Sequence, residues 1–453
     1  MSDTGIPSAN ILFQTSSMDK LNEFDVIVVG AGAAGLSAAL ELTKAGRKVL
    51  VLEARNRIGG RIYTIEDEGF SQPLEAGAEF IHGQLPHTCT FLEKAGIKYE
   101  TIGDKIWHVT DGKVHREKEF IKDWDLLMKA LQELKHDQTI EEFLNSHFSN
   151  DKYKELRETT LQYTQGYNAA APGKASTLAL KREWEAEDDE HQYRIERGYG
   201  QLMDYFQKEI SSTGGTIILS APVTRIKWKR FEVEVITLNR KSYYTKQVLI
   251  TVPLGVLQAP EGSDASITFS PSLPEKYSAI QLMGFGAAIK IHIQCLNNFW
   301  EEKSLQYPMK NVEFIFSDAF IPTWWTQHPN DNGLLTGWLA GPKASNLQNA
   351  TDDFIFEKGV DALCYIFSLG KATLLQKIIG HKIHNWAAQP FSCGAYSYAT
   401  LHTADAIKVL NQPEEDTLFF AGEALVTGPM TGTVEAALNS GVDTARRMIT
   451  IKS

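Results

Sequence analysis

The chain has 453 residues, of which 43% are hydrophobic and 22% charged, and its formal net charge is −11. This composition is typical of a globular protein with room for two domains, and the negative charge argues against a nucleic-acid partner. Because there is no run of twenty apolar residues and no basic start followed by an apolar core, we expect no membrane partner, no secretory signal and a cytoplasmic location.

The first strong pattern along the chain is a strand, a glycine-rich turn and a helix. Residues 26–29 read VIVV, a short buried strand, and run into Gly30, Gly32 and Gly35. A helix is predicted over about 33–45 and a second strand over 48–52, with Glu53 at its end. This G-x-G-x-x-G arrangement predicts a dinucleotide site with phosphates on the helix amides and Glu53 on a ribose.

A second pair of glycines, Gly59 and Gly60, follows at once and is succeeded by Arg61. Two glycines let the backbone pass close to the same pyrophosphate, and the arginine offers it a forked cation. A site for NAD does not need this extension. The pattern therefore favours FAD.

The middle of the chain indicates a second domain and a return to the first. Charged helical segments are predicted over 125–148, and the acidic run 185–191 is either a solvated face or an attraction for a cationic substrate. Residues 216–257 are typical of a strand-rich meander, whose strand over 248–252 would rejoin the cofactor sheet.

The cofactor domain is therefore predicted to be discontinuous. We assign it residues 21–85, 200–260 and 386–453, and the substrate domain residues 86–199 and 261–385, leaving 1–20 as an N-terminal extension.

Residues 286–295, GAAIKIHIQC, alternate between apolar and polar positions as a strand with one dry and one wet face does. Judged on this stretch alone, Lys290 lies on the wet face and points to solvent.

The last segment repeats the order strand, glycine, helix. Residues 418–450 end in a helix with an apolar stripe, and its N-terminus near Gly432 and Thr433 would offer free amides and a positive dipole end to an anionic reduced flavin. The alternative is a terminal helix that only packs against the core.

The four cysteines fall singly, without the paired spacing of a zinc site or a dithiol redox centre. No metal is expected, and the compartment is expected to be reducing.

Taken together, eight motifs resemble the flavin-dependent amine oxidase family, which includes monoamine oxidases, polyamine oxidases and lysine-specific histone demethylases. They run in family order over nearly the whole chain and read VIVVGAGAAGLSAALEL, VLEARNRIGGR, AGAEFIHG, IERGYGQLM, VPLGVL, GFGAAIKI, WAAQPFSCGAYSY and FAGEA with GTVEAALNSG. The resemblance implies an α/β flavoprotein of two domains, with a Rossmann-type FAD-binding domain and a substrate domain of a mixed sheet and helices.

The resemblance also implies which residues contact FAD, with Val223 near adenine and Glu423 near the ribityl chain or pyrophosphate. The expected cofactor-binding residues are Gly30, Gly32, Ala34, Gly35, Glu53, Ala54, Arg55, Gly60, Arg61, Gly77, Ala78, Glu79, Phe80, Val223, Trp386, Gly422, Glu423, Gly432, Thr433 and Val434. Monoamine oxidases carry a flavin-linked cysteine at the position of Ala395, so we expect non-covalent FAD here.

The resemblance reverses the interpretation of Lys290, because the family strand carries a lysine that holds a water against the flavin. The expected catalytic residues are Lys290, Tyr396 and His82, and the expected substrate contacts are Glu79, His82, Tyr396 and Pro429. Tyr396 would form one wall beside the flavin, Glu79 would pair with a distal ammonium, and His82 would hydrogen-bond the substrate. The second aromatic wall of monoamine oxidases is absent, since Pro429 takes its position.

The implied activity is oxidation of an amine, with a di- or polyamine as the leading substrate, oxygen as the acceptor and a monomer or homodimer as the active form. Only the neutral amine has the lone pair that this oxidation needs, and an apolar aromatic pocket favours it by desolvating the cation. An L-amino acid oxidase is the alternative, with Arg194 holding the substrate carboxylate. A non-oxidase FAD protein, acting as a desaturase, isomerase or binding partner, is a third. A histone-demethylase role is less favoured because no long coiled-coil insertion or extra N-terminal domain is seen.

Overall fold

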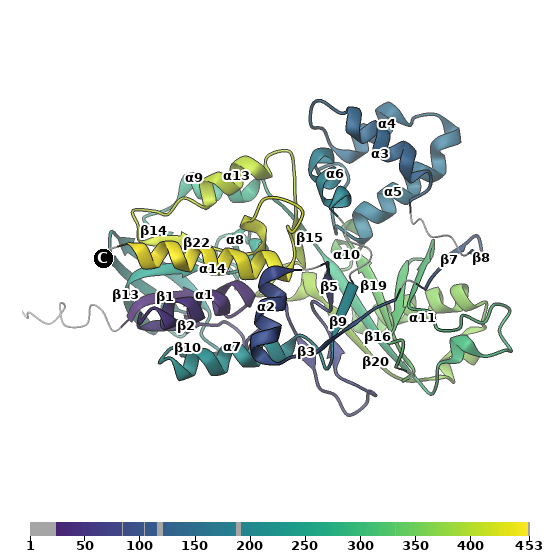
Figure 1. Cartoon of the computed structure of the whole chain (residues 1–453), viewed down its shortest axis with the longest axis horizontal. Helices are drawn as coiled ribbons and strands as arrows, with labels where there is room; N and C mark the ends of the chain where they lie inside the picture. The colour runs from purple at the N-terminus through teal and green to yellow at the C-terminus, as the bar shows by residue number, and fades with distance from the viewer. Residues whose placement is uncertain are drawn as a thin grey trace, which may run out of the picture.

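The computed structural model describes residues 24–83, 85–103, 105–115, 121–186, 192–330 and 332–451. These residues form two lobes, each built on one large sheet (Figure 1). The predicted extension 1–20 and residues 187–191 of the acidic run lie outside the described residues.

The first lobe contains an eight-stranded sheet in which β1 (Phe24–Val29) lies between β2 (Val49–Leu52) and β13 (Ser242–Ile250), parallel to both. The predicted strands near residues 26, 48 and 248 are therefore confirmed, as is the return of the third to the sheet of the first. The other strands are β10 (Thr216–Ile218), β12 (Glu232–Thr237), β11 (Val223–Lys229), β14 (Thr268–Ser270) and β22 (Leu418–Phe420).

Helices cover both faces of this sheet. On one face α1 (Ala33–Lys44) packs against α14 (Val434–Thr450), and both are seen side by side in Figure 1. They approach closely because of Gly441, where an added Cβ would lie 2.2 Å from the carbonyl oxygen of Ala34. The remaining helices of this lobe are α2 (Pro86–Ala95), α7 (Gly200–Ser212), α8 (Leu254–Leu257), α9 (Pro274–Gln281) and α13 (Thr403–Leu410).

Two segments that we assigned to the substrate domain pack against the first lobe instead. Helix α2 contributes Phe91 and Leu92 to the core formed by α1 and α14. Strand β14 joins the first sheet, and α9 contributes Ala279 and Ile280 to the core on its other face. The apolar pattern of a helix or strand shows that one face is buried but not which lobe buries it, so we propose to move both boundaries.

The second lobe is built on a seven-stranded mixed sheet around β16 (Ala288–Cys295). Its other strands are β20 (Ile378–Asn385), β19 (Leu334–Ala340), β18 (Thr323–Thr326), β17 (Phe314–Ser317), β7 (Ile106–Thr110) and β8 (Lys113–His115). Helix α11 (Asp352–Phe367) covers the face that carries the isoleucines of β16. Two short helices, α10 (Pro342–Ser345) and α12 (Lys371–Leu375), complete this layer.

The other face of β16 is not wet, so the prediction that Lys290 points to solvent is wrong. Residues 71–79 cross this face and form hydrogen bonds with two of its polar side chains. Gln294 accepts hydrogen bonds from the amide and hydroxyl of Ser71 at 3.0 and 2.9 Å, and Lys290 donates to the Glu75 carbonyl at 2.8 Å. Every residue of β16 is consequently buried.

Four helices form a separate group at the upper right of Figure 1. They are α3 (Trp124–Glu133), α4 (Ile140–His147), α5 (Lys154–Gly166) and α6 (Thr177–Glu185). The first two confirm the helices predicted over 125–148. Three small sheets are added to the two large ones: β5 (Phe80–His82) with β9 (Gln192–Ile195) and β6 (Tyr99–Thr101), β3 (Thr64–Ile65) with β4 (Leu74–Glu75), and β15 (Gly284–Gly286) with β21 (Tyr396–Tyr398).

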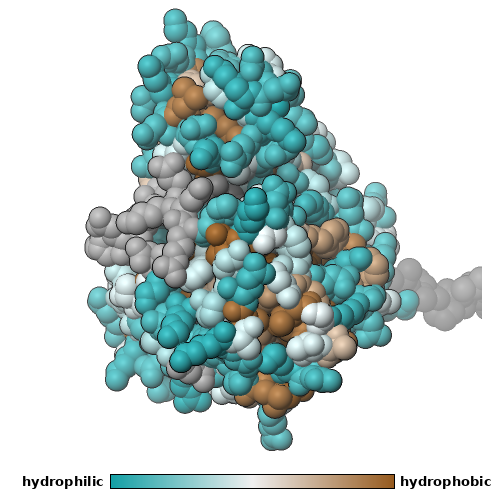
Figure 2. Space-filling view, turned by 90° about the vertical axis from the view of Figure 1, so that its right-hand side faces the viewer, coloured by the Kyte–Doolittle hydropathy of each residue, from teal (hydrophilic) through white to brown (hydrophobic). Residues whose placement is uncertain are grey.

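The side of the molecule that carries the second lobe is covered mainly by hydrophilic residues, with small hydrophobic groups between them (Figure 2). Within the described ranges, no helix is both long enough and apolar enough to cross a membrane.

The contact between α1 and α14 predicts the effect of Gly441→Ala. The new methyl group would overlap the Ala34 carbonyl, so the helices must separate, at a cost of about 1–3 kcal/mol. We expect a lower midpoint of thermal unfolding. Gly166→Ala is the matched control, because this helical glycine has no heavy atom within 4 Å of an added Cβ. Equal midpoints for Gly441→Ala and the wild type would contradict the packing described.

Candidate active site

A continuous cavity of about 1550 Å³ is lined by residues of both lobes. One end is formed by the turn between β1 and α1 and by the start of β11. The other end is formed by β16, β18 and β19 of the second sheet. The cavity thus connects the predicted dinucleotide turn with the strand that carries Lys290.

The turn between β1 and α1 is open toward the cavity. Gly30 has φ of 108°, a left-handed conformation that favours glycine. Gly32 is the N-cap of α1 and provides no side-chain cap, while the first helical residues Ala33 and Ala34 line the cavity. A Cβ on Gly32 would meet nothing nearer than the Gly59 carbonyl at 3.9 Å. Uncapped amides at a helix N-terminus attract phosphate, so this end fits a dinucleotide.

Glu53 lies at the end of β2, as predicted, and is almost fully buried. Its Oε2 accepts a hydrogen bond from the Ala31 amide at 2.7 Å, and its Oε1 accepts one from the Arg55 amide at 2.9 Å. These bonds fix the carboxylate on the cavity wall. The lone pairs that these two bonds leave unused are the acceptors that the expected ribose hydroxyls need.

The cavity brings together the predicted cofactor-binding residues, with one exception. Gly35 does not line it, because its role is to let α1 touch β1: an added Cβ would lie 2.0 Å from the Gly30 carbonyl. The others all line the cavity; they are Gly30, Gly32, Ala34, Glu53, Ala54, Arg55, Gly60, Arg61, Gly77, Ala78, Glu79, Phe80, Val223, Trp386, Gly422, Glu423, Gly432, Thr433 and Val434.

Arg61 and Glu423 form an ion pair on this wall. The Arg61 Nη1 lies 2.7 Å from Glu423 Oε1 and donates a hydrogen bond to the Ala395 carbonyl, also at 2.7 Å. The Ser397 hydroxyl donates to the other carboxylate oxygen of Glu423. The Arg61 guanidinium, which is expected to bind a pyrophosphate, is therefore already oriented, and one of its nitrogens already donates to protein groups.

The N-terminus of α14 also reaches the cavity through Thr433 and Val434. The Thr433 hydroxyl accepts a hydrogen bond from the Ala436 amide at 3.1 Å, so the first turn is partly capped. Leu438 and Ala445 on the same helix are buried in the first core. The two interpretations of this helix are compatible, since it packs along its length and presents its first turn to the cavity.

Lys290 lies on the cavity wall and is only 3% exposed. Its Nζ donates to Glu79 Oε2 at 2.7 Å and to the Glu75 carbonyl at 2.8 Å. The same Nζ lies 5.1 Å from the centre of the Trp325 ring, within cation–π range. The lysine is therefore held from three directions.

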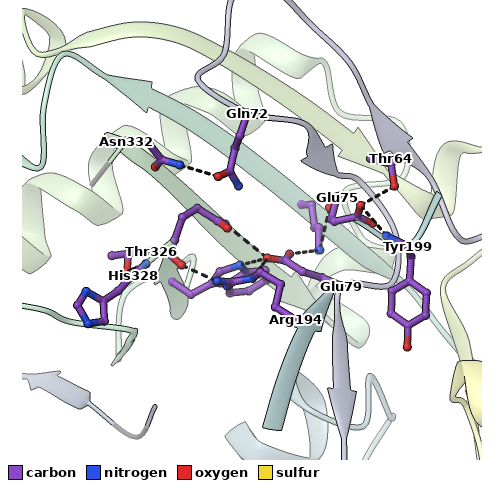
Figure 3. Close-up of polar contacts among 12 residues, drawn as sticks. Thr64, Gln72, Glu75, Glu79, Arg194, Tyr199, Thr326, His328 and Asn332 are labelled. Carbon is purple, nitrogen blue, oxygen red and sulfur yellow. Dashed lines mark hydrogen bonds and ion pairs between the residues drawn. The ribbon is translucent and has the colours of Figure 1, made fainter. Parts of the chain in front are cut away.

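Both carboxylate oxygens of Glu79, the residue expected to pair with a distal ammonium, contact groups of the protein. Its Oε1 accepts hydrogen bonds from Trp325 Nε1 at 3.0 Å and from Gln327 Nε2 at 3.5 Å, and lies 3.3 Å from Arg194 Nε (Figure 3). Burial alone would raise the pKa of the Glu79 carboxyl, but the Lys290 and Arg194 cations outweigh burial and hold this pKa at about 2. The carboxylate stays charged, and the Lys290 and Arg194 cations of the protein compensate this charge.

Arg194, which the amino acid alternative expects to hold the substrate carboxylate, likewise contacts groups of the protein. It stands opposite Phe80 on the neighbouring strand β5, and its guanidinium lies over the Phe80 ring at 5.1 Å. Its Nη2 donates to the Thr326 carbonyl at 3.3 Å. The side chain is not part of the cavity lining.

Glu75 is a second buried carboxyl beside Lys290, and sequence reasoning did not single it out. Burial raises its pKa to about 7, although Thr64 and Tyr199 donate to its Oε1 (Figure 3). Its Oε2 is buried without a hydrogen-bond partner. Near neutral pH this carboxyl is therefore poised between its neutral and charged forms.

Aromatic side chains form the walls at the Lys290 end. Trp338 faces Lys290 across the β16–β19 pairing, and the rings of Trp338 and Tyr396 are parallel to within 9° at 6.4 Å. Burial raises the pKa of Tyr396, whose hydroxyl donates to the Tyr167 carbonyl at 2.6 Å. Trp386 also lines the cavity and donates its ring N–H to the Ala76 carbonyl.

The remaining predicted residues also line the cavity. His82 lines the cavity and is exposed to it, its Nδ1 contacts Gln192 Oε1, and desolvation by the surrounding cavity walls lowers its pKa. Pro429 and Ala395 are also on the lining. Cys393 is not, and its thiol donates to the Pro390 carbonyl.

Sequence reasoning missed Trp325 and Trp338 as well as Glu75. The strand of Trp325, β18, pairs with the strand of Trp338, β19, and β19 in turn pairs with β16, so the two tryptophans come near Lys290 only in the folded sheet. The one local signal was the aromatic strand TWWT of β18.

Known proteins are similar to this chain over most of its length. The family described as flavin containing amine oxidoreductase matches residues 33–449. Lysine-specific histone demethylase 1B of Mus musculus is 26% identical over 93% of this chain and 52% of its own length. Polyamine oxidase 4 of Oryza sativa subsp. japonica is 27% identical over 98% of this chain and 92% of its own length. The chain thus spans about half of the histone demethylase.

Two solved structures share the fold. Putrescine oxidase bound to putrescine superposes with a TM-score of 0.77 at 19% identity, covering 94% of this chain and 99% of the other. Cyclohexylamine oxidase from Brevibacterium oxydans IH-35A gives 0.78 at 19% identity with the same coverage.

The raised pKa of Glu75 predicts a pH dependence of stability. The folded state keeps this proton up to about pH 7, whereas the unfolded chain releases it near the ordinary value of 4.5, so stability falls by about 3 kcal/mol as the pH rises between them. Glu75→Gln stays neutral, so we expect its thermal midpoint to exceed that of the wild type at pH 8 and to match it at pH 4.

The exposed Glu68→Gln of the same segment is the control and should leave both midpoints unchanged. An equal loss of stability in Glu75→Gln and the wild type between pH 4 and 8 would show that another group titrates.

Proposed function

The chain belongs to the flavin-containing amine oxidoreductase family, and we propose that it is an FAD-dependent amine oxidase that uses oxygen and releases hydrogen peroxide. The observation that carries this proposal is the buried Lys290 on the wall of a cavity whose other end is an open glycine turn. FAD, when bound, supplies the acceptor for a hydride equivalent from the carbon next to the amine nitrogen. The resulting imine would be hydrolysed by water to an aldehyde or ketone.

The residues present fit FAD without a covalent bond. The uncapped amides of α1 would hold the phosphates, Glu53 the ribose, and Val223 the adenine. Glu423 would lie near the ribityl chain or pyrophosphate. Ala395 has no nucleophile to offer to the flavin, and the neighbouring Cys393 points away to a backbone carbonyl.

The aromatic end of the cavity would select the neutral amine. Alkylammonium ions lose a proton only near pH 10 in water, and desolvation between Trp338 and Tyr396 favours that loss. Two of the three Lys290 N–H donors contact Glu79 and the Glu75 carbonyl. We assign the third donor to a water in the cavity. Lys290 would position this water for the reoxidation of the reduced flavin by oxygen.

A di- or polyamine is the leading substrate class, with Glu183 in place of Glu79 as the partner of the distal ammonium. The Glu183 carboxylate accepts a hydrogen bond from Asn168 Nδ2 at 2.8 Å, and its charge adds to the burial that raises the pKa of Tyr396. Pro429 leaves the cavity wall without a second aromatic ring there. The acidic residues of the described lining are Glu53, Glu79, Glu183, Asp264 and Glu423.

An L-amino acid oxidase is disfavoured because Arg194 pairs with Glu79 and lies off the cavity lining. We further propose a cytoplasmic location, a monomer or homodimer, and no nucleic-acid or membrane partner.

The substrate class is tested by anaerobic mixing of the FAD-loaded protein with spermine, spermidine, putrescine, a monoamine, a peptide carrying N-methylated lysine, or L-arginine. We expect spermine, spermidine or putrescine to bleach the visible flavin absorbance. In Lys290→Met we expect the flavin to stay bound and its reoxidation by oxygen to slow roughly tenfold to a hundredfold, because the positioned water is lost. Bleaching by L-arginine alone would identify an amino acid oxidase, and no bleaching at all would favour a non-oxidase flavoprotein.

The role of Glu183 predicts a split between substrates. Glu183→Gln removes one charge-assisted contact, so we expect KM for a polyamine to rise roughly tenfold to a hundredfold while KM for a monoamine is unchanged. Glu185→Gln, on the same helix but exposed, is the matched control. An equal rise for both substrates would place the distal ammonium elsewhere.

A further inference from the structure

We propose that Glu79 is a positioning residue of the oxidase site, which holds the Lys290 ammonium in place and does not itself bind the substrate. This inference rests on the proposed function, since it concerns how Lys290 does its work. It changes the role expected for Glu79 from a substrate contact to a part of the apparatus around the catalytic lysine.

The first argument is that the protein saturates the Glu79 carboxylate. Oε2 accepts a hydrogen bond from the Lys290 ammonium at 2.7 Å. Oε1 accepts hydrogen bonds from Trp325 and Gln327 and forms an ion pair with Arg194 (Figure 3). The side chain is 3% exposed. A substrate ammonium would have to displace one of two buried cations, which would then be left without an anion, and this is costly.

The second argument is that a partner of Glu79, Trp325, also restrains Lys290. Trp325 donates its ring N–H to Glu79 and places its ring 5.1 Å from the Lys290 Nζ. Glu75, which accepts from Lys290 through its carbonyl, lies on the same crossing segment as Glu79. The ammonium is therefore located by an anion, a carbonyl and an aromatic face that are coupled to one another.

The third argument concerns charge. Lys290 and Arg194 are cations and Glu79 is an anion, so the group carries one net positive charge beside the cavity. The other titratable side chains that face it are Glu75, which is poised near neutrality, and His292 and His384, where burial lowers the pKa to about 3 and about 4. Both histidines are neutral at pH 7, so Glu79 is the anion that faces the Lys290 side chain.

The test uses the FAD-loaded full chain with Glu79→Gln, Lys290→Met and the double variant. If Glu79 acts through Lys290, Glu79→Gln slows flavin reoxidation by oxygen roughly tenfold, and the double variant is no slower than Lys290→Met alone. Additive losses, or no loss in Glu79→Gln, would overturn the proposal. Glu302→Gln, which breaks a lysine ion pair outside the cavity lining, is the matched control.

A second measurement does not depend on turnover: the visible absorbance of the bound oxidised flavin between pH 6 and 9.5. In Glu79→Gln the lysine loses its anion while the Arg194 cation remains, so its proton leaves at lower pH and a new titration step is expected. The step should be missing in the double variant. A step that persists there, or none in Glu79→Gln, would contradict the proposal.

Glu79→Asp keeps the negative charge, but its shorter side chain moves the carboxylate oxygen away from Lys290. This variant serves as the test if Glu79→Gln does not fold. We expect an intermediate loss of rate and no titration step, whereas wild-type rates would overturn the positioning role. If Lys290→Met itself reoxidises normally, or no amine reduces the flavin, the proposed function fails, while the absorbance titration still tests Glu79.

Discussion

The buried ion pair between Lys290 and Glu79 is the interaction on which the site depends. Two charges removed from water are stable only when further hydrogen bonds satisfy both. Here the carboxylate has Trp325, Gln327 and Arg194 in addition to the lysine, and the ammonium has the Glu75 carbonyl. Because both groups have these partners, a charged lysine can lie in the wall of the cavity between the two lobes.

The path of residues 71–79 through the fold brings these partners together. Residues 71–79 leave the first lobe, cross the polar face of β16 and return through β5 to the cavity. The same sheet that buries isoleucines beneath α11 therefore presents its other face to the crossing segment. At the far end, the glycine turn leaves helix amides open. The cavity thus has uncapped helix amides at one end and a buried ion pair at the other, which under the proposed function would hold the phosphates and face the reacting amine.

Local sequence could predict the dinucleotide turn, because its strand, glycines and helix are contiguous and each glycine has a steric reason. It could not predict that Lys290 is buried, since the alternation of β16 is the same whether its polar face meets water or residues 71–79. The family resemblance placed Lys290 and Tyr396 on the cavity. It could not supply the partners of Glu79, because Arg194 and Trp325 reach it only through the pairing of strands distant in sequence.

The most direct test of the account is a crystal structure of the FAD-loaded enzyme. The account predicts that the flavin ring lies against the Lys290 side of the cavity, with the Lys290–Glu79 pair retained and no bond from the flavin to the protein. A flavin ring at the opposite end, or a Glu79 that leaves Lys290 to meet the ligand, would contradict it.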